Sequence, residues 1–196
     1  MREIAKEYYD ELIDLLGSIE VTGRTDGKFD LYRGVEAAGL LICKQNAQGR
    51  KVIFVGNGAS AAMSSHASTD FWKNGGLKAI AFNDSSLLTC ISNDYGYQHV
   101  FEKPVEMFAE PGDVLFAISS SGNSENIVRA VQAAKAKDCK ILTLTGFKPD
   151  NRLRCLGDLN FYVAAKDYGP VEIIHHSICH CILDTIIKAK NGQVSD

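Results

Sequence analysis

The stretch VIFVGNGAS (residues 52–60) decides the fold class of this chain. A short β-branched, apolar run ends at Gly56, and a helical pattern begins at about Ser60. The stretch LFAISSSGNS (residues 115–124) repeats the arrangement, because a buried strand again passes through small polar residues into a helix. Apolar strands that alternate with amphipathic helices are typical of an open parallel sheet covered by helices on both faces.

The same alternation continues outward from these two stretches. It predicts a three-layer, doubly wound α/β domain of about five parallel strands over residues 49–196. Residues 1–48 show helical periodicity instead, interrupted by the turn-type sequence VTGRTDGK (21–28). We expect this segment to belong to the same unit and to clasp the domain or an oligomer. The expected helices are at about 2–20, 29–45, 60–72, 124–137 and 171–188, and the expected strands are at 52–55, 78–82, 113–118, 141–145 and 159–164.

The composition is that of an ordinary globular protein, with 45% hydrophobic and 23% charged residues. A formal net charge of -3 gives no electrostatic footprint for nucleic acid or for an anionic membrane. No apolar run has the length of a membrane-spanning helix, and the acidic N-terminus differs from a signal peptide. The six cysteines form no CxxC pair, and several lie in apolar runs, which indicates buried thiols in a reducing compartment. We therefore expect a cytoplasmic protein with neither nucleic-acid nor membrane partners.

The two strand-to-helix loops are suited to an anion such as phosphate. Open sheets of this type bind ligands beyond the carboxyl ends of their strands. Small residues let a ligand approach the backbone, and the N–H groups and dipole at a helix start favour negative charge. The second loop adds four serine hydroxyls within six residues, Ser119 to Ser124.

Two other interpretations of these loops stay open at this point. Serine and asparagine at helix starts are often only caps, and glycine-rich loops are often only tight turns. Gly56, Gly58 and Ala61 also fit a degenerate dinucleotide pattern, with Asn83-Asp84 at the next strand end as a ribose-binding acid. The serine-rich second loop has no role in a dinucleotide site, so a compact phosphate ligand is the better interpretation.

Three segments in order, GNGAS (56–60), SSSGNS (119–124) and LTLTG (142–146), resemble the sugar isomerase (SIS) family, and most closely its phosphoheptose isomerase branch. The similarity runs from about Lys51 to Lys190. It implies an open five-stranded sheet, a homotetramer, and conversion of sedoheptulose 7-phosphate to D-glycero-D-manno-heptose 7-phosphate, which supplies heptose for lipopolysaccharide, capsule or other surface glycans. The resemblance places the substrate at Asn57, Gly58, Ser60, Ser119, Ser120, Ser121 and Ser124.

The same resemblance implies the acid–base groups and a zinc site. The family takes them from a helical H-x-x-x-E motif, here His66 and Asp70, and from a histidine on the last helix, here His180. Carried over, the catalytic pair is Asp70 and His180, and Glu172 contacts the substrate. Asp94 also has a family counterpart near the substrate, although Asn-Asp-Tyr-Gly equally fits a plain turn. The implied zinc ligands are His66, Asp70, Glu172 and His180.

The chain departs from the family pattern at three places. Asp70 replaces a glutamate, DYGPVE (167–172) replaces a D-R-x-Q-E run, and Lys73 is the nearest cation where an arginine is usual. These changes indicate a different sugar phosphate or an altered metal preference. His99, His175 and His176 receive no role, although His176 shares a helix stripe with Glu172 and His180. The alternative function is a non-catalytic SIS protein that binds a sugar phosphate or a protein partner such as a replication initiator.

Overall fold

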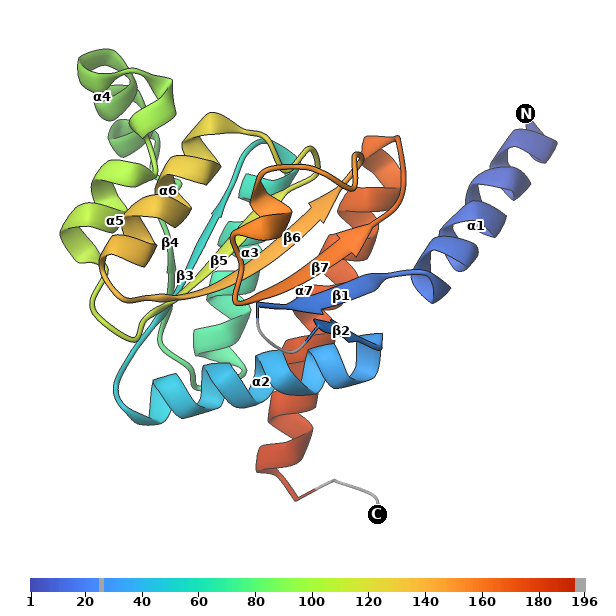
Figure 1. The fold of residues 1–196 in the computed structure, drawn as a ribbon, viewed down its shortest axis with the longest axis horizontal. Coiled ribbons are helices and arrows are strands. Elements are labelled where there is room, and N and C mark those ends of the chain that lie inside the picture. Colours follow the sequence, from blue (N-terminus) through green and yellow to red (C-terminus); the bar gives the residue numbers. More distant parts are fainter. Residues whose placement is uncertain (25–26, 193–196) are drawn as a thin grey trace.

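The computed structural model describes residues 1–24 and 27–192, which form a sheet with helices on both faces (Figure 1). The strands are β1 (Glu20–Gly23), β2 (Gly27–Phe29), β3 (Val52–Gly56), β4 (Ala79–Ala81), β5 (Val114–Ser119), β6 (Lys140–Gly146) and β7 (Leu159–Val163). The helices are α1 (Arg2–Gly17), α2 (Leu31–Ala47), α3 (Ala59–Lys73), α4 (Ser85–Tyr95), α5 (Glu102–Phe108), α6 (Glu125–Ala136) and α7 (Tyr168–Lys190), with short 3₁₀ turns η1 (Tyr97–His99) and η2 (Leu153–Cys155).

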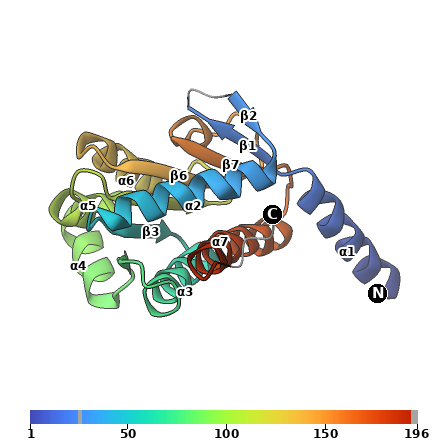
Figure 2. The ribbon, with the colours of Figure 1, turned by 90° about the horizontal axis from the view of Figure 1, so that it is seen from below.

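The sheet order among these residues is β2-β1-β7-β6-β5-β3-β4. The five strands β7, β6, β5, β3 and β4 are parallel to one another, as the sequence predicts. Successive side chains of a strand point to opposite faces, so each buried strand supplies two cores. Phe54 packs between Phe71 and Phe116 on the face that α2, α3 and α7 cover, whereas Ile53 and Val55 face α5 and α6. Figure 2 shows α2, α3 and α7 together on one side of the sheet.

The segment 21–28 differs from its sequence-based prediction as a turn. β1 and β2 form an antiparallel hairpin, and β1 pairs antiparallel with β7, with Val21 opposite Phe161. The hairpin extends the sheet at an edge where Val21 becomes almost fully buried. Strands of four and three residues are too short to show period-two alternation, which is why the pattern suggested only a turn. Residues 25 and 26 of the predicted turn lie outside the described residues.

Helices also follow β4 and precede β1. The sequence did not predict α4 and α5, which follow β4; Asp84 starts α4 by accepting hydrogen bonds from the backbone N–H groups of Ser86 and Leu87. Asp84 is therefore a helix cap and not a ribose-binding acid. At the other end of the chain, α1 extends away from the sheet and helices (Figures 1 and 2). Within residues 1–24 and 27–192, no helix combines the length and apolarity needed to cross a bilayer.

Candidate active site

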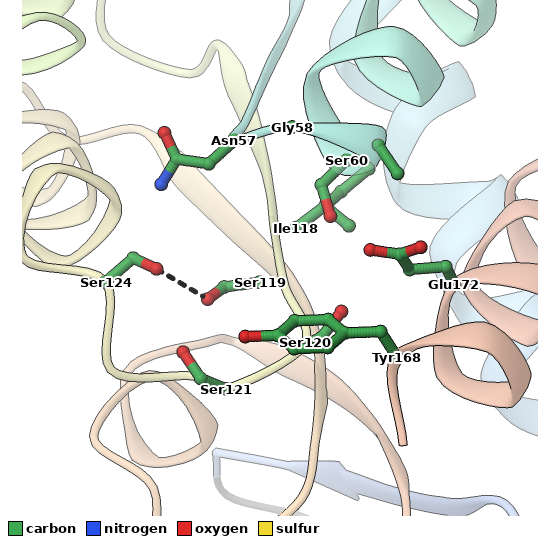
Figure 3. A pocket seen from close by; sticks show the side chains of 11 residues that line it. Asn57, Gly58, Ser60, Ile118, Ser119, Ser120, Ser121, Ser124, Tyr168 and Glu172 are labelled. Carbon is green, nitrogen blue, oxygen red and sulfur yellow. Dashed lines mark hydrogen bonds between the residues drawn. The ribbon is translucent and has the colours of Figure 1, made fainter.

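The two predicted loops meet in a cavity of about 220 Å³ at the carboxyl ends of β3 and β5 (Figure 3). All the predicted substrate-binding residues except Asp94 line it. The start of α7 closes the opposite side, where the Glu172 carboxylate points toward Ser60 and Tyr168 also lines the cavity. The lining residues are Asn57, Gly58, Ala59, Ser60, Ile118, Ser119, Ser120, Ser121, Ser124, Tyr168 and Glu172.

Both helices that start at this cavity lack a side-chain cap. α3 begins after Gly58, which has a φ of 54° and no side chain to offer, and α6 begins after Ser124, whose hydroxyl makes no capping bond. Helix N-termini leave several N–H groups without intrahelical partners. The interpretation of these residues as mere caps therefore fails at both loops, and their N–H groups remain for an anion.

The serine hydroxyls are only partly used by the fold. Ser119 Oγ contacts Ser124 Oγ at 3.3 Å and accepts a hydrogen bond from the Gly122 N–H at 3.2 Å. The Oγ of Ser120 is buried and has no hydrogen-bond partner among the described residues. Because a buried polar atom without a partner is costly, the free Ser120 hydroxyl indicates a ligand that completes the loop.

The side chain of Asn57 is held by residues that sequence reasoning missed. Asn57 and Asn126 exchange two amide hydrogen bonds of 2.9 and 2.8 Å, and the Tyr97 hydroxyl donates to Asn57 Oδ1 at 3.0 Å. With its amide engaged, Asn57 presents its backbone to the cavity. The signal available in the sequence was a polar Asn126 in the first turn of an otherwise apolar-faced helix.

Glu172 joins the serine cavity to a second cavity of about 310 Å³. The second cavity is lined by Met63 and His66 of α3 and by Ile173 and His176 of α7. The two cavities share Ala59 and Glu172 in their lining, so they lie next to each other at the start of α7.

Three histidines meet where α3 packs against α7. Ligand atoms of His66, His176 and His180 all lie within 4.8 Å of one another. The Nε2 atoms of His176 and His180 are 3.1 Å apart, and Asp70 Oδ2 lies 3.1 Å from His66 Nε2. This cluster contains two of the four predicted zinc ligands, with Asp70 beside it and Glu172 one helical turn away. Burial, followed by the nearby His180 and His66, lowers the pKa of His176, which favours the neutral imidazole that a metal requires.

The other histidines and Asp94 lie apart from this centre. His175 is fully buried, and its Nε2–H donates to the Thr145 carbonyl at 3.1 Å, which fixes α7 against β6. Burial lowers the pKa of His175 to about 4, so this ring is neutral. His99 pairs with Glu102. Asp94 is exposed on α4, next to Cys90 and Asn93, and does not line the described cavities.

Comparisons with known proteins identify the family of this chain. The SIS domain family model matches residues 7–146. A phosphoheptose isomerase of Helicobacter hepaticus is 35% identical over 171 residues, covering 84% of this chain and 86% of the relative. A phosphoheptose isomerase of Vibrio cholerae is 39% identical over 160 residues, covering 79% and 83%. The structure of phosphoheptose isomerase GmhA from Neisseria gonorrhoeae superposes with a TM-score of 0.83 at 30% identity, covering 94% of this chain and 98% of that one.

The family and fold expected from the loop motifs are thus confirmed. The order of the parallel strands, the paired helix starts and the relatives all lead to one assignment. The chain belongs to the SIS domain family, within its phosphoheptose isomerase branch.

Proposed function

We propose that this chain interconverts sedoheptulose 7-phosphate and D-glycero-D-manno-heptose 7-phosphate, and so supplies heptose for surface glycans. The observation that supports it most is the meeting of two uncapped helix N-termini and an unpartnered serine hydroxyl in one cavity. A second cavity, which shares Glu172 with the first, is lined by His66 and His176 of the imidazole cluster, so phosphate-binding and proton-transferring groups lie near each other.

The phosphate would be held mainly by neutral donors. The N-termini of α3 and α6 provide backbone N–H groups, and Ser60, Ser119, Ser120, Ser121 and Ser124 provide hydroxyls. No lysine or arginine lines this cavity among the described residues, so the helix dipoles take the place of a cationic partner. Tyr168 lines the cavity and packs edge-to-face against Phe147, with their ring centroids 4.9 Å apart.

The isomerisation requires a proton to move between two neighbouring carbons. A base removes a proton from C1 of the ketose, an enediol forms, and the proton returns to C2 while another moves from the C1 oxygen to the C2 oxygen. The reaction is an isomerisation, so it needs no co-reactant. His180 and Asp70 are the acid–base pair that the resemblance predicts. Asp70 contacts His66, so we expect it to act through that imidazole, whereas Glu172 is the carboxylate that faces both cavities.

A zinc ion fits the residues at the helix contact. The donor set offers neutral imidazoles with adjacent carboxylates, which is the chemistry that zinc prefers. The resemblance assigns the ion to His66, Asp70, Glu172 and His180. When bound, it would polarise the sugar carbonyl and stabilise negative charge on its oxygen.

We further propose a homotetramer in the cytoplasm. Supporting this, α1 extends from the rest of the chain and leaves Ile4, Tyr9 and Ile13 largely exposed, with only Leu15 buried. Large apolar side chains exposed around a projecting helix are typical of a surface covered by another subunit.

The decisive experiment is incubation of purified protein with sedoheptulose 7-phosphate, with and without added zinc, and detection of the aldose phosphate. Conversion that His180→Ala abolishes without unfolding the protein supports the proposal. Binding of the sugar phosphate without any conversion, with metal supplied, would identify a non-catalytic sugar-phosphate-binding protein instead.

A further inference from the structure

His176 occupies a place that the family-based ligand set leaves out. It lies on α7 one turn after Glu172 and one turn before His180. Its ring centroid is 4.6 Å from that of His180 and 5.2 Å from that of His66. The cluster therefore receives two imidazoles from α7 and one from α3.

The three nitrogen donors are close enough for one ion. Ligands at about 2.0–2.1 Å from a tetrahedral zinc lie roughly 3.3 Å from one another. His176 Nε2 and His180 Nε2 are 3.1 Å apart, which matches this spacing. All the ligand atoms of the group lie within 4.8 Å of one another, so the half-exposed His66 ring has to come closer to reach the same spacing.

Neither predicted carboxylate belongs to this group of ligand atoms within the described residues. Both oxygens of Asp70 are engaged, since Oδ2 contacts His66 Nε2 at 3.1 Å and Oδ1 accepts from Asn74 Nδ2 at 3.2 Å. A carboxylate that accepts from one ring nitrogen of a histidine typically orients the other nitrogen toward a metal, so His66 would bind the ion through Nδ1. Glu172 faces the space between the two cavities.

We propose that His176 is a metal ligand, so that His66, His176 and His180 hold one zinc ion with three imidazoles. Asp70 then acts as a positioning residue for His66, and Glu172 stays off the metal. This ligand assignment refines the metal site of the proposed function. Three imidazoles favour zinc over magnesium, which prefers oxygen ligands.

The position of the cluster leaves one side of the ion open to substrate. His66 and His176 both line the second cavity, which Glu172 shares with the serine cavity. Catalytic zinc sites usually combine three protein ligands with one open position. The arrangement separates a three-imidazole metal site from a carboxylate that is free to exchange protons.

The test is zinc binding by the metal-free protein, measured in competition with a chromophoric chelator. His176→Ala should weaken zinc binding at least about 100-fold, because a direct ligand is worth more than an outer partner. Glu172→Ala should leave zinc affinity within about threefold, because that side chain makes no bond to the ion in this assignment. His99→Ala is the matched control, an imidazole removed outside the cluster, and should bind zinc as the unaltered protein does.

Substitution of cobalt(II) for zinc gives a second readout, since its visible absorption reports the ligand set independently of turnover. His176→Ala should change this spectrum, and Glu172→Ala should not. If the His176 variant does not fold, as judged by circular dichroism, His176→Leu fills more of the space without offering a donor atom and serves in its place. The proposal is overturned if Glu172→Ala loses zinc, if the His176 variant retains it, or if the unaltered protein binds no zinc. If the metal-site proposal fails in this way but the protein still converts the sugar phosphate without metal, the proposed isomerase function is unaffected.

Discussion

Individual serines in the loop after β5 differ in what they do for the fold. Ser119 Oγ bonds within the loop, to Ser124 Oγ and the Gly122 N–H, whereas Ser120 Oγ has no partner among the described residues. Removal of a hydroxyl that makes a hydrogen bond lowers the free energy of unfolding by about 1 kcal/mol. Removal of a buried hydroxyl without a partner changes it little or even raises it. Alanine substitutions at Ser119 and Ser120 should therefore affect phosphate binding and folding stability differently.

Ser120→Ala should raise KM for the sugar phosphate about tenfold, the value of one lost hydrogen bond, with no loss in the free energy of unfolding. Ser119→Ala should lose both affinity and about 1 kcal/mol of stability. Steady-state kinetics and urea unfolding of the two variants check this. An unchanged KM for Ser120→Ala would mean that its hydroxyl does not contact the phosphate.

The thiols should differ in reactivity. Burial, with a smaller contribution from Asp113, raises the pKa of Cys139 to about 11, whereas Cys90 and Cys155 are exposed. Only the thiolate reacts with iodoacetamide. Cys90 and Cys155 should be alkylated first in the native protein at pH 8, and Cys139 only after unfolding, as followed by peptide mass spectrometry. Equal labelling of Cys139 in the native state would contradict its burial.

Residues with a local pattern were predictable, and residues that depend on packing between distant elements were not. The serines and glycines of the two loops follow strands directly, so their convergence at one sheet edge could be derived from the sequence. Asn126 and Tyr97 reach Asn57 only because α6 and η1 pack beside β3. His176 was on the predicted stripe of α7, but only the packing of α3 against α7 shows which nitrogens meet.

At the scale of elements, the buried parallel strands and their helices were predicted to within a few residues. Long apolar runs bounded by glycine carry a strong signal. The β1–β2 hairpin has no such signal in the sequence, because it is short and is stabilised by pairing with β7 and by burial of Val21. The helices α4 and α5 were missed in a segment where polar and apolar residues mix without a clear period.

The turn between β5 and α6 depends on Gly122. Its φ is 62°, and a Cβ there would lie 1.9 Å from Asn151 Oδ1. Asn151 cannot move away easily, since it is buried and bonded to the Lys148 carbonyl and the Arg154 N–H. Gly122→Ala should therefore cost more than about 2 kcal/mol and abolish phosphate binding, through backbone strain and steric overlap together.

The matched control for that variant is Gly76→Ala. Gly76 has nearly the same φ, 61°, but nothing lies within 4 Å of the added Cβ. It should show the backbone cost alone, about 1–2 kcal/mol, with unchanged phosphate binding. Thermal unfolding and phosphate titration of both variants test the prediction, which fails if the two behave alike.

For the whole molecule, the projecting helix α1 predicts self-association. Ile4 and Ile13 are 67% and 66% exposed, on a helix that contributes a single buried residue. Replacing both with lysine should lower the oligomer mass measured by light scattering, while circular dichroism of the monomer stays unchanged. Substituting the exposed Tyr32 of α2 with lysine is the control. An oligomer that survives the double change would show that another surface holds the subunits together.

The way α7 runs past both cavities sets a requirement on substrate length. Glu172, His176 and His180 follow one another at intervals of four residues, so the helix places them about 6 Å apart along its axis. With the phosphate held at the serine loop, only a sugar of sufficient carbon count brings its carbonyl to the imidazoles. A phosphosugar one carbon shorter would leave that carbonyl about 1 Å away from its place, and a shift of this size costs about 100-fold in rate. The enzyme would then discriminate between sugars with identical phosphates by chain length alone.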